Sequence, residues 1–189
     1  MRKKFIPVSI IVILLIATGC RTNPDPLWST IGASPTQSPP ETLLNHLAGQ
    51  WTLTGAFGGT ATVHEIDARW VLNHEYLIFR ETSRDRTTNG QPAYEAIVLL
   101  SENPKSRDCS CLWLDNTSPN GLSSGIVAHG QATADTLPFL FQYPTNGTLH
   151  TTFHYSATTD TWQWTIESDQ DGKHETFGRA TLVRKRKRS

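Results

Sequence analysis

Seven histidines and seventeen carboxylates supply most of the groups that could do chemistry in this chain of 189 residues. His150 and His154 would share one face of a strand, but they would lie about 13 Å apart at about 3.3 Å per residue. His64, His74 and His174 each precede a glutamate, and neighbours along a strand point to opposite faces. The local spacing therefore predicts no metal site and no acid–base pair. A metal site built from residues on different strands is the alternative.

The remaining carboxylates and hydroxyls show no pattern typical of catalysis. The chain has no G-x-S-x-G turn, no phosphate-binding loop and no dinucleotide-binding glycine pattern. Glu81, Glu95 and Asp115 are single carboxylates on different predicted strands, and the sequence does not give the separation that glycosidic chemistry would need. An enzyme is the less favoured class, and no residue is assigned a catalytic role.

Two cysteines, Cys109 and Cys111, flank a single serine. In an extended strand they would share a face, about 6 to 7 Å apart, with side chains poorly directed for a disulfide. Free buried thiols are the favoured state. A disulfide in a local turn, or a metal site completed by other strands, is the alternative.

The elements that must position these groups are almost all strands. Apolar and polar residues alternate with a period of two in Gln50 to Phe57, in Leu149 to Tyr155 and around Trp162 to Ile166. Turn signals such as Gly58-Gly59 and Asn146-Gly147 separate these runs. We predict a short helical turn within 41–47, followed by ten strands at 50–57, 60–66, 74–84, 93–102, 109–115, 123–131, 137–143, 148–156, 161–168 and 173–184.

Ten consecutive antiparallel strands predict an all-β, up-and-down barrel, because closure removes the exposed edges of such a sheet. A barrel of this size can hold a small ligand. Alternation suggests a partly aromatic interior, in which Arg80 would share a face with Tyr76 and Ile78 and either anchor an acidic ligand group or form a salt bridge. The candidate ligand-binding residues are Tyr76, Arg80, Trp113, Asp115, Tyr155 and Trp164.

The first twenty residues predict export. Arg2, Lys3 and Lys4 precede an apolar run that is too short to span a bilayer, and the segment ends in Leu15-Ile16-Ala17-Thr18-Gly19-Cys20. This segment resembles a bacterial lipoprotein signal with its lipobox. The resemblance implies cleavage before Cys20, acyl chains on Cys20, and a membrane anchor. The alternative is an ordinary signal cleaved near Ala17 to Gly19.

The predicted organisation is a signal peptide at 1–19, a proline- and serine-rich tether at 20–40, a barrel domain at 41–184 and a basic tail at 185–189. The whole chain is formally neutral. Between Cys20 and Val183, however, nine basic side chains face seventeen acidic ones, and five basic residues follow from Arg184 to Arg188. This run could contact anionic lipid headgroups or simply be solvated. The acidic body and the export signal argue against a nucleic-acid partner.

Three short motifs carry a second resemblance: Leu47-Ala48-Gly49-Gln50-Trp51, Trp113-Leu114-Asp115, and the strand from Thr176 into Arg184. With these the chain is similar to an uncharacterised family of bacterial lipocalin-like domains, over about residues 43 to 185. The resemblance implies a calycin-like barrel in which Trp51 lies at the closed end under a basic side chain, Arg184 or Arg179. It implies no established reaction. Barrels of related shape can bind haem through one histidine, but we expect no cofactor here.

The sequence thus predicts a lipid-anchored envelope protein whose barrel binds a small, largely apolar molecule. Its location would be the outer membrane if the source has two membranes, and otherwise the outer face of the cytoplasmic membrane. One alternative is an envelope interaction or structural protein whose barrel is filled by its own side chains. Another is an enzyme with a site inside the barrel.

Overall fold

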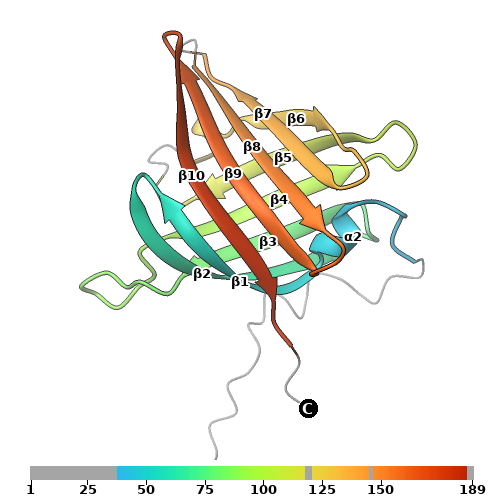
Figure 1. Cartoon of the computed structure of the whole chain (residues 1–189), viewed down its shortest axis with the longest axis horizontal. Helices are drawn as coiled ribbons and strands as arrows, with labels where there is room; N and C mark the ends of the chain where they lie inside the picture. Colours follow the sequence, from blue (N-terminus) through green and yellow to red (C-terminus); the bar gives the residue numbers. More distant parts are fainter. Residues whose placement is uncertain (1–37, 118–120, 145–146, 187–189) are drawn as a thin grey trace, which may run out of the picture.

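The computed structural model describes residues 38–117, 121–144 and 147–186. The predicted signal sequence, most of the predicted tether and the last three residues lie outside this part. Ten antiparallel strands form a closed barrel with each strand next to its neighbours in sequence, and β1 pairs with β10 (Figure 1). Their bounds are β1 (Gly49–Phe57), β2 (Thr60–Val71), β3 (Tyr76–Ser83), β4 (Glu95–Glu102), β5 (Asp108–Asp115), β6 (Val127–Gln131), β7 (Thr136–Gln142), β8 (Gly147–Ser156), β9 (Thr161–Gln170) and β10 (Lys173–Arg184).

The predicted all-β, up-and-down barrel is confirmed, and each of the ten predicted strands has a counterpart. Two bounds differ. β2 continues to Val71, since Ile66, Ala68 and Val71 carry its buried face beyond the predicted end. β6 begins only at Val127, because the 3₁₀ turn η1 (Gly121–Ser124) occupies the start of the predicted strand.

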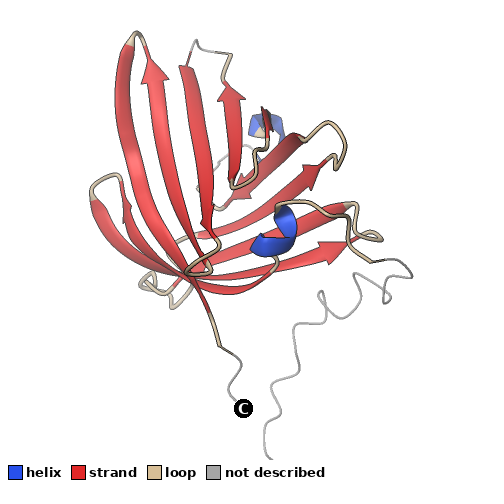
Figure 2. Cartoon of the chain, turned by 45° about the vertical axis from the view of Figure 1, so that its right-hand side comes forward, coloured by secondary structure: helices blue, strands red, loops and turns tan. Residues whose placement is uncertain are grey.

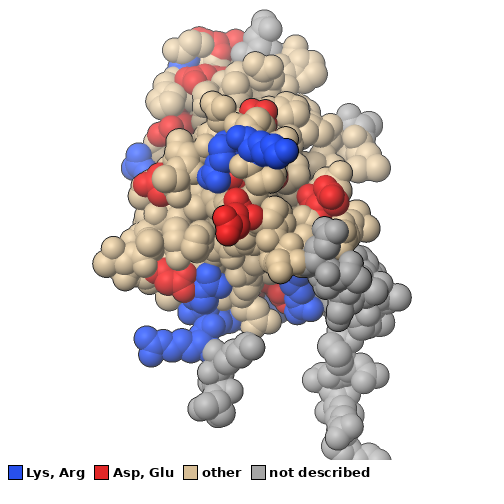
Figure 3. All heavy atoms as spheres, turned by 90° about the vertical axis from the view of Figure 1, so that its right-hand side faces the viewer, with Lys and Arg blue, Asp and Glu red and all other residues tan. Residues whose placement is uncertain are grey.

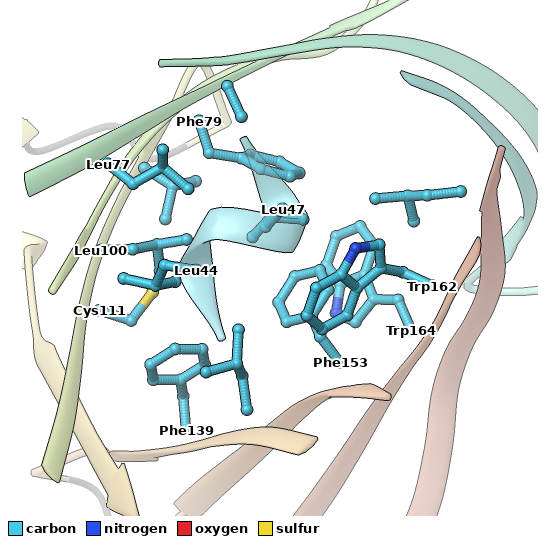
Figure 4. Close-up of a cluster of buried hydrophobic side chains, with 14 of the residues drawn as sticks. Leu44, Leu47, Leu77, Phe79, Leu100, Cys111, Phe139, Phe153, Trp162 and Trp164 are labelled. Atoms are coloured by element: carbon cyan, nitrogen blue, oxygen red, sulfur yellow. The ribbon is translucent and has the colours of Figure 1, made fainter. Parts of the chain in front are cut away.

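One helical turn, α2 (Leu44–Leu47), lies across one end of the barrel and closes it (Figure 2). Leu44 and Leu47 are fully buried, and Figure 4 shows both pointing into the cluster of Phe139, Phe153 and Trp162. Burial of these side chains, rather than helix propensity, holds so short an element. We call this the closed end. In the described part of the chain, no helix is long and apolar enough to cross a membrane.

Trp51 and Arg184 meet at the closed end. Trp51 is fully buried and donates its Nε1–H to the Leu47 carbonyl at 2.8 Å, while the Arg184 guanidinium lies 4.0 Å from the centre of its ring. Arg184 also donates to the carbonyls of Ala48 and His46, at 2.9 and 2.7 Å. The arrangement expected from the lipocalin resemblance is therefore present, with Arg184 rather than Arg179 as the cation.

Gly49 makes this contact sterically feasible. Its backbone has φ +133°, and a Cβ added there would lie 2.4 Å from Arg184 Nη1. A side chain would both strain the backbone and displace the guanidinium. The glycine of the first motif thus makes room for the arginine of the last strand.

Both described ends of the chain leave the barrel at the closed end. β10 ends at Arg184, and the Lys185 amide donates to the Gln50 carbonyl at 2.8 Å. Lys185 also pairs with Glu65 through its side chain. Figure 3 shows basic side chains at the lower edge of one face and mixed charges elsewhere on that face. The first residues of the basic run are thus bound to the barrel wall.

The face of β3 that lines the interior differs from the prediction. Leu77, Phe79 and Glu81 are fully buried, whereas Tyr76 is 42% exposed. The Arg80 side chain lies on the outer face, where it approaches Glu95 at 3.9 Å. The predicted inward placement of Tyr76 and Arg80 is therefore wrong. Directly paired residues share a face, and the pairing of Ile66 with Glu81 places the even-numbered residues of β3 outside.

Candidate ligand-binding site

A cavity of about 610 Å³ opens at the end of the barrel opposite α2, where the β1–β2 and β7–β8 connections lie. We call this the open end. Its lining is mostly apolar, with threonines and a few ionisable groups among the rings. The aromatic members are Phe57, Tyr94, Trp113, Phe141, Tyr143, Trp164 and Phe177. A second hollow of similar volume lies near α2 and is more open to solvent.

A hydrogen-bonded relay of three polar residues, Thr62, His64 and Glu81, lies in the cavity wall. His64 comes from β2 and is buried, and its Nδ1 contacts Glu81 Oε1 on β3. On its other side, His64 Nε2 lies 2.6 Å from Thr62 Oγ1. Alternation along β2 directs Thr62 and His64 to one face, and pairing with β3 brings Glu81 beside them.

Burial sets the protonation of the Glu81 carboxyl. Desolvation raises its pKa above the ordinary value of 4.5, and the charge of Asp115 acts in the same direction. The hydrogen bond and charge of His64 act in the opposite direction. Glu81 is thus a fully buried carboxyl whose charge depends on the histidine beside it.

Two buried polar atoms of the cavity residues have no hydrogen-bond partner within the described structure: Glu81 Oε2 and Trp164 Nε1. Glu81 is 0% exposed and Trp164 is 2% exposed, so bulk water has little access to either. An unpaired buried donor or acceptor costs about 1–3 kcal/mol. The cavity wall therefore contains one acceptor and one donor whose hydrogen bonds the folded chain does not supply.

Tyr94, Trp113 and Asp115 form a second polar group in the wall. Trp113 Nε1 donates to the Tyr94 hydroxyl at 2.9 Å, and Tyr94 in turn hydrogen-bonds Asp115. The amide and the hydroxyl of Thr117 donate to Asp115 Oδ1 at 2.8 and 2.6 Å. Burial, followed by the charge of Glu81, raises the pKa of Tyr94. The tyrosine thus stays neutral between two carboxyls.

The structure brings three of the six predicted ligand-binding residues to this cavity: Trp113, Asp115 and Trp164. Tyr76 and Arg80 lie on the outer face of β3, as described above. Tyr155 is near the closed end, where it stacks on His46 at 4.5 Å and donates to Asp160 at 3.1 Å. Its position at the C-terminal end of β8, far from the β7–β8 connection, keeps it out of the open-end lining.

Sequence reasoning missed the pair of His64 and Glu81. His64 was compared only with its neighbour Glu65, which points outward and accepts a hydrogen bond from Arg84 at 2.7 Å. The Gly58-Gly59 hairpin was recognisable, and it places His64 opposite Leu53 on the inner face. The pairing of β1 with β2 was therefore the signal that could have placed His64 inside the barrel. The next register, from β2 to β3, has no comparable signal.

Cys109 and Cys111 are both buried and free. Cys109 Sγ lies 3.4 Å from the Pro138 carbonyl, and burial raises the pKa of this thiol to about 12. Burial also raises the pKa of Cys111. Within the described residues, no group of three or more histidine, cysteine or carboxylate side chains is placed to hold a metal ion.

Comparison with known proteins supports the architecture. No protein-family model matches the chain, and no curated protein matches it in sequence. The crystal structure of Rv2717c from M. tuberculosis matches with a TM-score of 0.54, covering 76% of this chain and 95% of that chain. The fold is shared. At 15% sequence identity the similarity extends to the fold alone.

Proposed function

We propose that this protein is a binding module for a small, largely apolar molecule that occupies the cavity at the open end. The observation that carries the proposal is the cavity itself: aromatic walls enclose two buried, unpartnered polar atoms, Glu81 Oε2 and Trp164 Nε1. Apolar pockets of roughly 300–1,000 Å³ with a few placed polar groups are typical of small-molecule sites. A volume of about 610 Å³ lies in that range.

The distribution of packing favours this function over a barrel filled by its own side chains. Leu44, Leu47, Phe139 and Phe153 belong to one packed cluster of buried side chains around α2 (Figure 4). Towards the open end the wall residues surround unfilled space instead, and Phe177 at the rim is 50% exposed. A filled barrel would bury such a ring and would pair the polar atoms of its interior.

Native mass spectrometry of the full chain, extracted from its own host into lipid nanodiscs, tests the proposal. We expect a retained small molecule of defined mass, which fragmentation then assigns to a chemical class. Thr151→Phe should abolish the retained mass, because Thr151 is 2% exposed and lines the cavity. Thr181→Phe is the matched control, since Thr181 lies on the outer wall and donates to Gln163 at 3.0 Å. A retained mass unaffected by Thr151→Phe would contradict binding in this cavity.

The same proposal places the module at the cell envelope, anchored through acyl chains on Cys20. The support is the lipobox-like sequence before Cys20, which lies outside the described residues. Cys20→Ser should leave the protein unprocessed or release it from the membrane fraction. Normal fractionation of this variant would contradict the anchor. Lipid contact by the basic tail is part of the proposal, and salt extraction of the Cys20→Ser chain measures it separately.

One observation favours a second candidate function, acyl hydrolysis inside the barrel. Thr62, His64 and Glu81 have the order of hydroxyl, imidazole and carboxylate in which a base activates a nucleophile. Thr62 Oγ1 would attack an ester carbonyl while its proton passes to His64 Nε2 and then to the departing alcohol. Water would then release the acid from Thr62.

A chromogenic butyrate ester tests this second function. Hydrolysis by the wild-type chain, its loss in Thr62→Val and its retention in Thr60→Val would support it. Thr60 is the matched control because it lines the cavity without contacting His64 through an observed hydrogen bond. Equal rates for the wild-type chain and Thr62→Val would contradict it.

A further inference from the structure

The ionisable side chains of the cavity carry a charge that restricts the ligand. Its described lining contains two carboxyls, Glu81 and Asp115, and one histidine, but no lysine or arginine. Glu81 pairs with His64, and Asp115 is a second acidic side chain in the lining. The described lining of the open-end cavity therefore has more acidic than basic side chains, and none of them is a permanent cation.

We propose that the cavity selects a small organic cation, a protonated amine or nitrogen heterocycle on an apolar body, whose N–H donates to Glu81 Oε2. This inference rests on the proposed binding function and specifies its ligand class. It gives the ligand a positively charged group, whereas the sequence allowed an acidic ligand group at Arg80 as one of two alternatives.

The unpartnered carboxylate oxygen is the first support. Glu81 Oε1 is engaged by His64, whereas Oε2 has no partner in the described structure and is buried in the wall. Of the common small-ligand groups, an N–H bound to a positive nitrogen forms the strongest hydrogen bond with such an oxygen. A ligand carboxylate can accept hydrogen bonds but cannot donate one, and it would place like charges together.

The aromatic walls are the second, independent support. Trp164 lies with its ring centre 5.0 Å from Phe57 and 5.4 Å from Trp113. Tyr94 stacks beside His64 at 5.5 Å. Indole and phenol faces attract cations within about 6 Å, tryptophan most strongly. The same walls accept an aromatic ring as the ligand body, and Trp164 Nε1 can donate to an acceptor on it.

The position of Arg80 removes the basis for an acidic ligand. Its side chain lies on the outer face of β3 and approaches Glu95, so it does not supply a positive charge to the interior. Glu81, the next residue, takes the interior place. Because the inner face of β3 carries Glu81 instead of Arg80, the interior offers a carboxyl to a ligand instead of a guanidinium.

Three probes of nearly equal size test the inference: 2-naphthylmethylammonium, 2-naphthalenemethanol and 2-naphthoate. Each is titrated against the full chain in zwitterionic lipid nanodiscs at neutral pH, following tryptophan fluorescence, with empty nanodiscs subtracted. We expect the ammonium to bind on the order of tenfold more tightly than the alcohol, and the carboxylate more weakly than both. Equal affinities for ammonium and alcohol, or preference for the carboxylate, would overturn the cation inference while leaving the binding module intact.

Variants locate the selectivity. Glu81→Gln should reduce the ratio of ammonium to alcohol affinity by about tenfold. Glu95→Gln is the matched control on the outer wall, and its ratio should equal that of the wild-type chain. Asp115→Asn provides a second test if Glu81→Gln does not fold, because it removes charge from the same cavity. An unchanged ratio in a folded Glu81→Gln or Asp115→Asn chain would contradict the inference. Failure of all three probes to bind the wild-type chain would contradict the binding function as well.

Discussion

The tryptophan donors at the two ends of the barrel are paired differently. At the closed end, Trp51, Trp162 and Arg184 all find backbone carbonyls or Asp160, and the helical turn fills the space beneath them. At the open end, Trp164 Nε1 and Glu81 Oε2 have no partner in the described structure, and both residues line the cavity. Thr42 Oγ1 beside α2 also lacks a hydrogen-bond partner there, whereas buried Glu102 forms an ion pair with Arg107. The tryptophan and arginine donors of the closed end therefore contribute stability, whereas Trp164 at the open end leaves a hydrogen bond that a ligand can complete.

The largest expected loss of stability comes from removing the buried tryptophan at the closed end. Trp51→Ala removes a fully buried indole together with its contacts to Arg184 and Leu47. We expect the free energy of unfolding to fall by about 3–5 kcal/mol, because the surrounding residues cannot fill the space. Urea unfolding measures this loss. Trp70→Ala, at a half-buried position bonded to Asn45 at 3.0 Å, should cost less. Equal losses in the two variants would contradict the special role of the fully buried Trp51 and its contact with Arg184.

Replacing Arg184 should have the next largest effect. Arg184→Met leaves the carbonyls of His46 and Ala48 without their donor and breaks the contact with Asp160, so we expect a loss of about 1–3 kcal/mol. Thermal unfolding reports the change. Arg184→Lys keeps the charge but lacks the planar fork needed to reach several acceptors. If charge alone were sufficient, the lysine variant would unfold like the wild-type chain.

A matched pair on β9 compares the two ends directly. Trp162 donates to the His46 carbonyl at 3.4 Å, whereas Trp164 Nε1 has no partner in the described structure. Both lose similar volume when replaced by phenylalanine. We therefore expect Trp162→Phe to be less stable than Trp164→Phe by about 1 kcal/mol, because only the first loses a hydrogen bond. Chemical denaturation without ligand measures the difference. The reverse order of stability in the two variants would contradict the difference between the two ends.

The pH dependence of stability should have opposite signs at the two ends. The folded-state pKa of Glu81 is raised above 4.5, mainly by burial, so its contribution to stability is complete below that value and is lost as pH rises through the folded pKa. Asp160 behaves oppositely. The hydrogen bond from Arg184 lowers its pKa below 3.8, so its contribution is present above that value and is lost as pH falls through the folded pKa.

Melting temperatures across a pH series test this difference. The stability of Glu81→Gln relative to the wild-type chain should rise as pH increases above about 4.5. The relative deficit of Asp160→Asn should shrink as pH falls below about 3.8. His64, Tyr94 and Asp115 face Glu81 and are unchanged in the comparison. Parallel pH profiles for the wild-type chain and Glu81→Gln would contradict the raised pKa. This is the smallest of the predicted effects.

The strand pattern was predictable because ten short alternating runs and their turn signals lie along the chain. Half of the six predicted ligand-binding residues lie outside the cavity, and β3 shows why. The segment Tyr76–Ser83 has apolar residues on both faces and adjacent charges at Arg80 and Glu81, so alternation alone could not choose the inner face. The choice comes from the turn that joins Val71 to Tyr76.

That turn carries little sequence signal. Leu72, Asn73 and His74 all adopt positive φ values, of 49°, 58° and 67°, where glycine would be expected. Its length therefore could not be read from composition, and neither could the register that places Glu81 beside His64. Trp164, by contrast, lies on a strand whose apolar residues share one face, and Trp113 alternates with the buried Cys109 and Cys111 on β5. Their positions in the cavity could be predicted from alternation.

The pairing of β1 with β10 also determines when the protein can become native. Trp51 lies opposite Arg184, so the first strand keeps an unpaired edge until the last strand is available. A chain that emerges from its N-terminus must carry that edge through nearly its whole synthesis or translocation. Loss of the last strand would leave two strand edges exposed and the Trp51 end uncapped. Barrel closure is thus a late step of folding, and it removes the strand edges through which chains could aggregate.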